Sequence, residues 1–368
     1  MTRNKTFNFS PGPSVLPTEA LEQAGAEICN YGSSGMSVME MSHRSSVYIE
    51  IFSEVKAKLK NALSVPDTHE ILFLQGGASL QFSMAPMNLI GDKGCADYAV
   101  TGSFSDIAYT EAKKYGRINL AASSGDKNHT YIPGQNMLKL DPGASYFYYC
   151  SNNTVYGTQW KYVPETGSVP IVCDMSSEIL SKPVEVSKYG LIFAGAQKNM
   201  APAGLTAVII NKSLLGRELP YTPLMMSYKL MAEKDSMYNT PPCWNIYILG
   251  LMLDWLERRG GVKGMEKETG EKAKLVYDTL AESKLYKACA LPGSESYMNI
   301  TFRTENEETD AEFVKGATAR GLLNLKGHRS VGGIRASLYN AQPIEGVLAL
   351  VEYMKEFEVK SRVQNKNA

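Results

Sequence analysis

Lys198 is the residue whose position most directly indicates chemistry. It lies in the segment Gly195–Asn199, between the apolar runs 191–194 and 205–210, so we expect it in a tight loop between two buried strands. Burial removes the hydration of an ammonium group and therefore favours the neutral amine, a nucleophile toward carbonyl carbons. The alternative is a structural lysine that extends its charged end to solvent.

Asp174 makes the chemical role of this lysine the better interpretation. It ends another apolar run, residues 169–173, and precedes Lys198 by 198 − 174 = 24 residues. A buried acid at a strand end, followed by a loop lysine, suits an enzyme that uses pyridoxal phosphate. The lysine holds this cofactor as a Schiff base, and the acid pairs with its protonated pyridine nitrogen.

The segment Gly76–Ser79 is a candidate phosphate site, because it opens a predicted helix directly after the apolar run 71–74. Small residues let backbone N–H groups approach a phosphate, and the helix dipole favours its negative charge. The segment is not a Walker loop, since no Gly-Lys-Ser/Thr follows, and it lacks the spacing of a dinucleotide fingerprint. Plain turn glycines would look the same, but beside Lys198 the best ligand is the cofactor phosphate.

Two of the four histidines are followed by arginine, in His43-Arg44 and His328-Arg329, and Arg335 follows the second pair. Guanidinium groups bind carboxylates and phosphates with two parallel hydrogen bonds. A substrate with a dianionic phosphate and a carboxylate would need about this much positive charge. The alternative is that both pairs are ordinary surface residues.

An alternation of short apolar strands and helices is expected to position these residues. The strands are expected near residues 71–74, 98–100, 146–150, 169–173, 191–194 and 205–210. Such alternation predicts a mostly parallel sheet covered on both faces, and ligands of such sheets bind at the carboxyl ends of the strands.

The pattern changes after about residue 260. Helices are expected near 266–284, 310–320 and 344–357, strands near 297–302 and 333–338, and a polar tail over 361–368. We therefore predict a large α/β domain over residues 16–260 and a small α+β domain over residues 1–15 and 261–368.

The composition is that of an ordinary globular protein, with 44% hydrophobic and 21% charged residues in 368. The 38 basic and 38 acidic residues give a net charge of +0, which argues against nucleic acid or an anionic membrane as a partner. No apolar run approaches the ~20 residues of a membrane helix and no secretory segment opens the chain, so we expect a cytoplasmic protein. The six cysteines and four histidines have neither disulfide nor metal-ligand spacing.

The chain resembles the phosphoserine aminotransferase family over essentially its whole length. The motifs that carry this resemblance are Asn8–Pro13, Asp174–Ser181, Tyr189-Gly190, Gly195–Asn199 and Lys326–Arg329. The resemblance implies a fold type I pyridoxal-phosphate-dependent transferase, with a mostly parallel seven-stranded sheet in its large domain. It also implies a homodimer with shared active sites.

The resemblance assigns roles to individual residues. It gives Thr154 to the cofactor's ring oxygen, Gln197 to its phosphate and Phe104 to its ring face. Asn239 and Thr240 reach across the dimer to the partner's cofactor phosphate. The implied cofactor-binding residues are Ala78, Ser79, Phe104, Thr154, Asp174, Gln197, Lys198, Asn239 and Thr240. The implied substrate-binding residues are Ser10, His43, Arg44, His328, Arg329 and Arg335, of which Arg335 takes the α-carboxylate and the two His-Arg pairs take the phosphate.

Two positions depart from common family patterns. Phe104 stands where many relatives have tryptophan, which keeps ring stacking but removes the indole N–H donor. Ala78-Ser79 stands where some members have Gly-Arg, so this chain lacks one positive charge near the cofactor phosphate.

The implied reaction is transfer of an amino group from glutamate to 3-phosphohydroxypyruvate, in serine biosynthesis, with 4-phosphohydroxythreonine in pyridoxine biosynthesis as a second product to test. A serine–glyoxylate aminotransferase of the same fold is one alternative, although an uncharged substrate side chain would not need two His-Arg pairs. A non-catalytic anion-binding α/β protein, in which Lys198 is structural, is the other.

Overall fold

The computed structural model describes residues 6–367, and side chains over residues 6–363. Residues 1–5 of the predicted small domain and Ala368 at the end of the predicted polar tail lie outside the described part.

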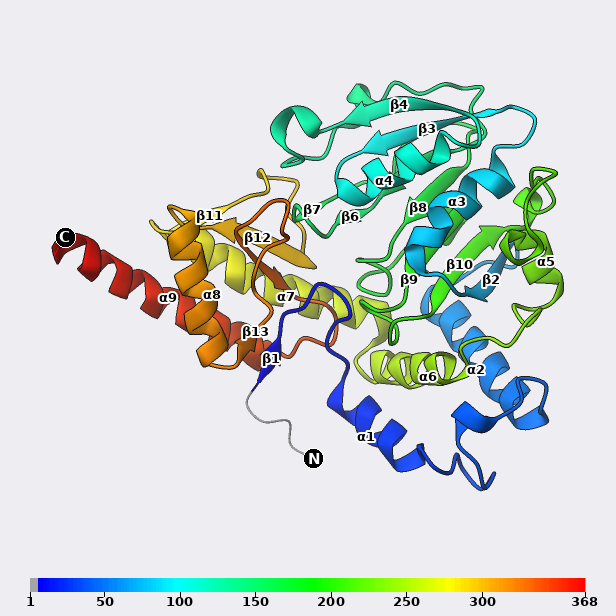
Figure 1. Cartoon of the computed structure of the whole chain (residues 1–368), viewed down its shortest axis with the longest axis horizontal. Coiled ribbons are helices and arrows are strands. Elements are labelled where there is room, and N and C mark those ends of the chain that lie inside the picture. The colour runs from blue at the N-terminus through cyan, green and yellow to red at the C-terminus, as the bar shows by residue number, and fades with distance from the viewer. Residues whose placement is uncertain (1–5, 368) are drawn as a thin grey trace.

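The central sheet of the described chain has seven strands, in the order β2-β10-β9-β8-β5-β3-β4 (Figure 1). Their bounds are β2 His69–Leu74, β3 Cys95–Val100, β4 Arg117–Ser123, β5 Phe147–Cys150, β8 Ile171–Asp174, β9 Leu191–Gly195 and β10 Thr206–Asn211. Strand β10 pairs antiparallel with both β2 and β9, whereas the other neighbouring pairs are parallel. The predicted α/β fold with a mostly parallel seven-stranded sheet is confirmed.

Helices cover both faces of this sheet, because successive side chains of each strand point to opposite sides. Phe147 and Tyr149 of β5 belong to one hydrophobic cluster, and Tyr148 between them belongs to the other. The first cluster includes residues of α1 Thr18–Glu27, α2 Ser46–Ala62 and α6 Cys243–Arg258, and the second includes residues of α3 Gly77–Leu89, α4 Ser103–Ala112 and α5 Tyr228–Glu233. With both faces buried, the strand ends are the edge at which polar side chains can meet a ligand.

Helix α6 and strand β4 are absent from the sequence-based predictions. In α6 every residue from Ile246 to Leu253 is buried, so the helix has no regular polar face and gives no clear 3.6-residue period. Strand β4 lies at the sheet edge and exposes Arg117 and Leu120, so it lacks the continuous apolar run of a central strand.

The C-terminal part has its own antiparallel sheet, in the order β11-β12-β14, with bounds Lys287–Ala288, Asn299–Arg303 and Ile334–Ser337. Helices α7 Gly261–Glu282, α8 Glu307–Ala319 and α9 Ile344–Asn367 accompany it, and α9 continues well beyond the predicted end near residue 357. This part has a separate hydrophobic cluster.

The N-terminal segment joins this C-terminal part. Strand β1 Phe7–Asn8 pairs in parallel with β13 Leu322–Leu323, and Phe9 belongs to the same hydrophobic cluster as Phe302 and Phe313. The division into domains, with residues 1–15 grouped with 261–368 and a boundary near residue 260, stays a prediction. Over the described residues, no helix is both long and apolar enough to cross a lipid bilayer.

Candidate active site

Lys198 lies in the connection between β9 and β10, two neighbouring antiparallel strands buried at the centre of the sheet. This confirms the expected loop between two buried strands. The backbone turns sharply after Gly195, with hydrogen bonds from the amides of Met200 and Ala201 to the carbonyl oxygen of Ala196. The Lys198 side chain is half-buried, so it is neither fully exposed to solvent nor fully enclosed in the core.

Two hydroxyl groups hold the Lys198 amine. Its Nζ donates to Ser177 Oγ at 2.6 Å and to Thr154 Oγ1 at 3.0 Å, and the two hydroxyl oxygens lie 2.6 Å apart. Thr154 comes from the loop after β5 and Ser177 from the turn after β8, so three neighbouring strands place their ends around one amine. Both acceptors are hydroxyl groups, which can donate as well as accept hydrogen bonds.

Asp174 is the last residue of β8 and is buried at this same edge. Burial raises the pKa of its carboxyl group, while the positive charge of Lys198 and hydrogen bonds from Ser176 act in the opposite direction. The Ser176 amide donates to Asp174 Oδ1 at 2.9 Å and fixes the carboxyl orientation. A cation brought beside this carboxyl group would offset the cost of its burial.

The first turn of α3 is open. Gly76 and Gly77 have φ values of 87° and 66°, a backbone region that glycine adopts without Cβ strain. A Cβ placed on Gly77 would meet no atom within 4 Å, so there is space in front of the turn. The first N–H groups of a helix have no intrahelical partners, and an anion can accept their hydrogen bonds.

The predicted phosphate-binding residues surround this open turn. Ala78 is half-buried and Ser79 exposed. A Cβ on Gly195 would lie 3.5 Å from the Ala78 amide nitrogen and 3.0 Å from Gln197 Oε1, so the turn, the end of β9 and Gln197 lie together.

Phe104, in the first turn of α4, faces the lysine. The Lys198 Nζ lies 5.5 Å from the centroid of its ring. The ring is 37% exposed, which is high for a core aromatic residue and leaves a face free for a planar ligand.

Arg335 of β14 is brought to the same place from the C-terminal part. Its side chain is 6% exposed, and its Nη1 donates to the carbonyl oxygen of Thr154 at 3.2 Å. Its Nε is buried without a hydrogen-bond partner in the described part of the chain. Burial also lowers its pKa. A buried guanidinium with an unused N–H donor is suited to bind an anion.

The N-terminal turn lies against the lysine loop. The Ser14 amide donates to the Gln197 carbonyl at 2.9 Å, and the Ser14 hydroxyl donates to the Lys198 carbonyl. Gly12 has φ 135°, and a Cβ there would lie 3.2 Å from Lys198 Cγ. Ser10, two residues earlier, is half-buried, and its amide donates to Asn8 Oδ1.

The two His-Arg pairs have different surroundings in the structure. His328 is half-buried, and its pKa is lowered by burial and by the positive charges of Arg335 and Arg329. His43 and Arg44 precede α2 and bond to each other, from Arg44 Nε to His43 Nε2 at 3.4 Å. In the chain described over residues 6–363, no hydrogen bond or ion pair joins this pair to Arg335.

Asn239 and Thr240 are exposed in the loop before α6. The Thr240 carbonyl accepts a hydrogen bond from Gln75 Nε2 at 3.1 Å, immediately before the start of α3. The loop is therefore at the surface beside the open turn of α3.

The site residues fit pyridoxal phosphate. The buried carboxyl of Asp174 suits a protonated ring nitrogen, the open turn of α3 suits a phosphate, and the half-exposed ring of Phe104 suits a stacked pyridine. The hydroxyl groups of Thr154 and Ser177 fix the position of the Lys198 amine at the same edge of the sheet. These features supply the acid, anion site, ring face and amine that the cofactor requires.

Ser177 is the contact that sequence reasoning did not assign. It stands in the motif after Asp174, but a serine in a turn is common enough to give no separate signal. Its position three residues after the acid, on a turn that returns toward the lysine, is the feature that could have identified it.

The comparisons with known proteins agree with this geometry. The family model described as aminotransferase class-V matches residues 6–350. A phosphoserine aminotransferase from Pseudomonas paraeruginosa is 49% identical over 354 residues, which is 96% of this chain and 98% of that protein. A solved phosphoserine aminotransferase from Bacillus circulans subsp. alkalophilus superposes with a TM-score of 0.95 at 45% identity and covers 97% of this chain and 99% of its own.

A more distant structure bears on the cofactor. A phosphoserine aminotransferase from Trichomonas vaginalis, solved with bound pyridoxal phosphate, superposes with a TM-score of 0.91 at 41% identity. It covers 95% of this chain and 99% of its own.

Proposed function

The chain belongs to the class-V aminotransferase family, and from that premise we propose how its own residues carry out the reaction. Its activity is that of a pyridoxal-phosphate-dependent phosphoserine aminotransferase. Glutamate gives its amino group to 3-phosphohydroxypyruvate, and the products are O-phosphoserine and 2-oxoglutarate. The observation that carries the proposal is Thr154, whose hydroxyl lies 3.0 Å from Lys198 Nζ while its carbonyl accepts Arg335 Nη1 at 3.2 Å.

Thr154 contacts both the Lys198 amine and the Arg335 guanidinium, so both groups can reach the same substrate molecule. Arg335 holds the α-carboxylate through its buried guanidinium, and this fixes the substrate Cα near Lys198. The Lys198 amine then takes the proton from Cα of the amino-acid donor, and in the second half of the reaction it delivers a proton to Cα of the product amino acid. When bound, pyridoxal phosphate supplies the electron sink that stabilises the negative charge left at Cα.

The remaining cofactor-binding residues would hold and orient pyridoxal phosphate. Asp174 keeps the ring nitrogen protonated, and Phe104 covers one ring face and excludes water from it. The first turn of α3, with Ala78, Ser79 and Gln197, binds the phosphate through backbone and side-chain donors.

The two His-Arg pairs bind the substrate phosphate. His328 and Arg329 lie on the Arg335 side of the site, where their charges act on one another. The second pair, His43-Arg44, completes the phosphate pocket, and Ser10 lines its N-terminal side. A substrate without a phosphate leaves these positive charges facing each other, so the phosphorylated substrate is preferred.

We further propose a homodimer with shared sites, in which Asn239 and Thr240 reach the partner's cofactor phosphate. Their exposure in the loop beside α3 supports this arrangement. It would also account for the His43-Arg44 pair, which within the described residues of one chain forms no hydrogen bond or ion pair with Arg335. The proposed setting is cytoplasmic serine biosynthesis, with 4-phosphohydroxythreonine formation in pyridoxine biosynthesis as an additional activity.

The test measures glutamate formed from 2-oxoglutarate with O-phosphoserine, with 4-phosphohydroxythreonine and with serine as amino donors, after the purified protein is saturated with pyridoxal phosphate. A strong preference for the phosphorylated donors supports the proposal. Equal turnover of serine would favour the serine–glyoxylate alternative. A protein that takes up no pyridoxal phosphate would leave the non-catalytic anion-binding alternative.

A further inference from the structure

Lys272 is a buried lysine in the middle of α7, remote in sequence from every residue assigned above. Its side chain is 3% exposed. The Nζ donates to the carbonyl oxygens of Tyr339, Asn340 and Gln342, at 3.0, 3.0 and 3.2 Å. An ammonium has three N–H donors, so all three are used on one short loop, residues 339–342.

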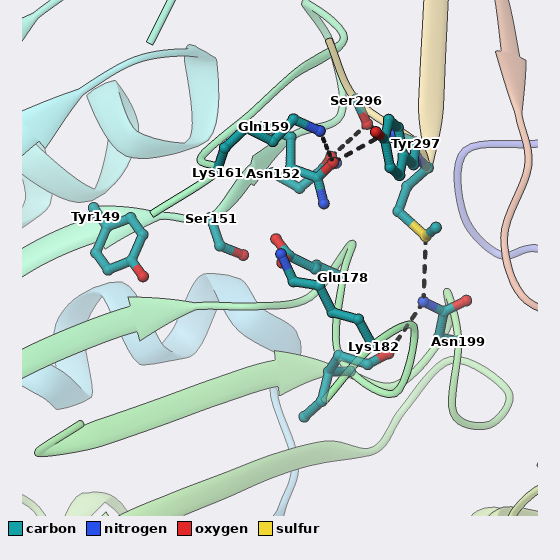
Figure 2. A network of polar contacts seen from close by, with 12 residues as sticks. Tyr149, Ser151, Asn152, Gln159, Lys161, Glu178, Lys182, Asn199, Ser296 and Tyr297 are labelled. Atoms are coloured by element: carbon teal, nitrogen blue, oxygen red, sulfur yellow. Dashed lines mark hydrogen bonds and ion pairs between the residues drawn. The ribbon is translucent and has the colours of Figure 1, made fainter. Parts of the chain in front are cut away.

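The same loop is bound on its other side to the lysine loop of the active site. The Asn340 amide donates to Asn199 Oδ1 at 2.9 Å, and Asn340 Nδ2 donates to the Leu180 carbonyl at 2.9 Å. Asn199 Nδ2 in turn donates to the Ile179 carbonyl at 3.1 Å (Figure 2). Asn199 directly follows Lys198, so the loop 339–342 is fastened to the backbone that carries the reactive amine.

The loop 339–342 also follows β14, the strand that carries Arg335. Tyr339 follows Arg335 by four residues, so a displacement of the loop moves the end of β14. The Arg335 Nη1 contact with the Thr154 carbonyl depends on that strand end. The loop is therefore the mechanical link between the anion-binding guanidinium and the amine.

We propose that Lys272 is a positioning residue, which holds the loop 339–342 and so fixes the distance between Arg335 and Lys198. This inference rests on the proposed function, because it takes Arg335 as the group that binds the substrate α-carboxylate. Its effect is on the binding of every substrate that carries this carboxylate, and it has no part in the choice between phosphorylated and unphosphorylated substrates.

The Lys272 ammonium is not well explained by a contribution to the stability of the folded protein. Burial lowers the pKa of Lys272 to about 8, with the charge of Arg259 acting in the same direction and that of Glu268 against it. The lowered pKa means that burial disfavours the charged form of Lys272 by more than its surroundings favour it. What an apolar chain cannot do is donate hydrogen bonds to three carbonyls at once.

The experiment compares Lys272→Met and Lys272→Gln with Lys267→Met, which removes an 80% exposed lysine from the same helix. Steady-state kinetics are measured with O-phosphoserine and with glutamate as amino donors. We expect Lys272→Met to raise KM about ten-fold for both donors and to change kcat less than about two-fold, because binding lost equally in ground and transition states appears in KM. Lys272→Gln, which keeps two N–H donors, should lie in between, and Lys267→Met should match the wild type.

A second measurement uses the protein without cofactor. Hydrogen exchange of residues 334–342 should be faster in Lys272→Met than in the wild type, while exchange in β3, a strand of the central sheet that does not pair with β14, stays unchanged. If Lys272→Met is insoluble, Lys272→Gln carries both measurements.

The outcomes separate this inference from the proposed function. If Arg335→Ala raises KM for both donors but the Lys272 variants leave both KM values unchanged, the positioning role is wrong and the proposed function stands. A fall in kcat with unchanged KM would also overturn the positioning role. If Arg335→Ala itself leaves both KM values unchanged, the carboxylate role and the proposed function lose their support.

Discussion

Replacement of Arg335 by alanine should lower kcat/KM for every amino donor and leave the order of preference among the donors unchanged. The residue is nearly fully buried, its Nε has no partner in the described part of the chain, and its Nη1 contacts the Thr154 carbonyl next to Lys198. Both phosphoserine and serine carry the α-carboxylate that this guanidinium is proposed to bind. Loss of the guanidinium therefore affects both donors through the same contact.

The magnitude follows from two charge-assisted hydrogen bonds. Each contributes about 1.5–3 kcal/mol, so removal of both costs about 3–6 kcal/mol. This corresponds to a loss of about two to four powers of ten in kcat/KM for each donor. Because Arg335 is buried, solvent screening does not reduce the effect. The exposed Arg44 and Arg329 should each lose about ten-fold, for phosphoserine only, which corresponds to one charge-assisted hydrogen bond at the weak end of its range.

The assay is the ratio of kcat/KM for phosphoserine over serine in the wild type, Arg335→Ala, Arg44→Ala and Arg329→Ala. Arg335→Lys is a matched control that keeps the charge but not the two parallel hydrogen bonds, and it should lose less than the alanine variant. The ratio should stay constant in Arg335→Ala and fall in the other two alanine variants. A collapse of the ratio in Arg335→Ala, with constant ratios in Arg44→Ala and Arg329→Ala, would refute the division between carboxylate and phosphate roles.

Four further results are expected. Lys198→Ala should fold but lose turnover and the visible band of the lysine-bound cofactor, and appreciable turnover would remove Lys198 as the anchor. Asp174→Asn should keep the cofactor but lose most of its kcat, so near-normal kcat with an unchanged spectrum would argue against its pairing with the ring nitrogen. Mixing Lys198→Ala chains with chains altered at both Asn239 and Thr240 should restore some activity if sites are shared, whereas a fully active monomer in sedimentation would contradict the dimer. The pKa of Lys272 is lowered to about 8 from 10.5, so the unfolded chain binds more protons between these values and stability should rise with pH across this window, by up to ~3 kcal/mol relative to Lys272→Met in denaturant titrations.

The fold could be predicted because the strands that carry the site are continuous apolar runs in a sheet covered on both faces. The positions of Asp174 and Lys198 at strand ends follow from the same pattern, since a single polar residue after a buried strand is easy to locate. Helix α6 could not be found this way, because burial on all sides removes the periodicity on which helix prediction depends.

The partners of the site residues were harder to predict than the residues themselves. The contact between Arg335 and Thr154 joins positions 181 residues apart, and no local pattern encodes it. Ser177 gave no signal of its own, and neither did Lys272, which looks like one more charged residue on an amphipathic helix. Long-range packing decides which serine contacts Lys198 Nζ and which lysine contacts the loop 339–342.

The pairing of β1 with β13 has a consequence for the order in which the protein is made. Phe7 leaves the ribosome early, yet its partner Leu322 is added 322 − 7 = 315 residues later. At about 5–20 residues per second, the N-terminal segment waits about 15–60 s for the strand it pairs with. During that time the β9–β10 loop can already form, but β14 with Arg335 has not been synthesised. The nascent chain therefore completes its central sheet first, and the site around Lys198 and Thr154 lacks the Arg335 guanidinium until synthesis is almost finished.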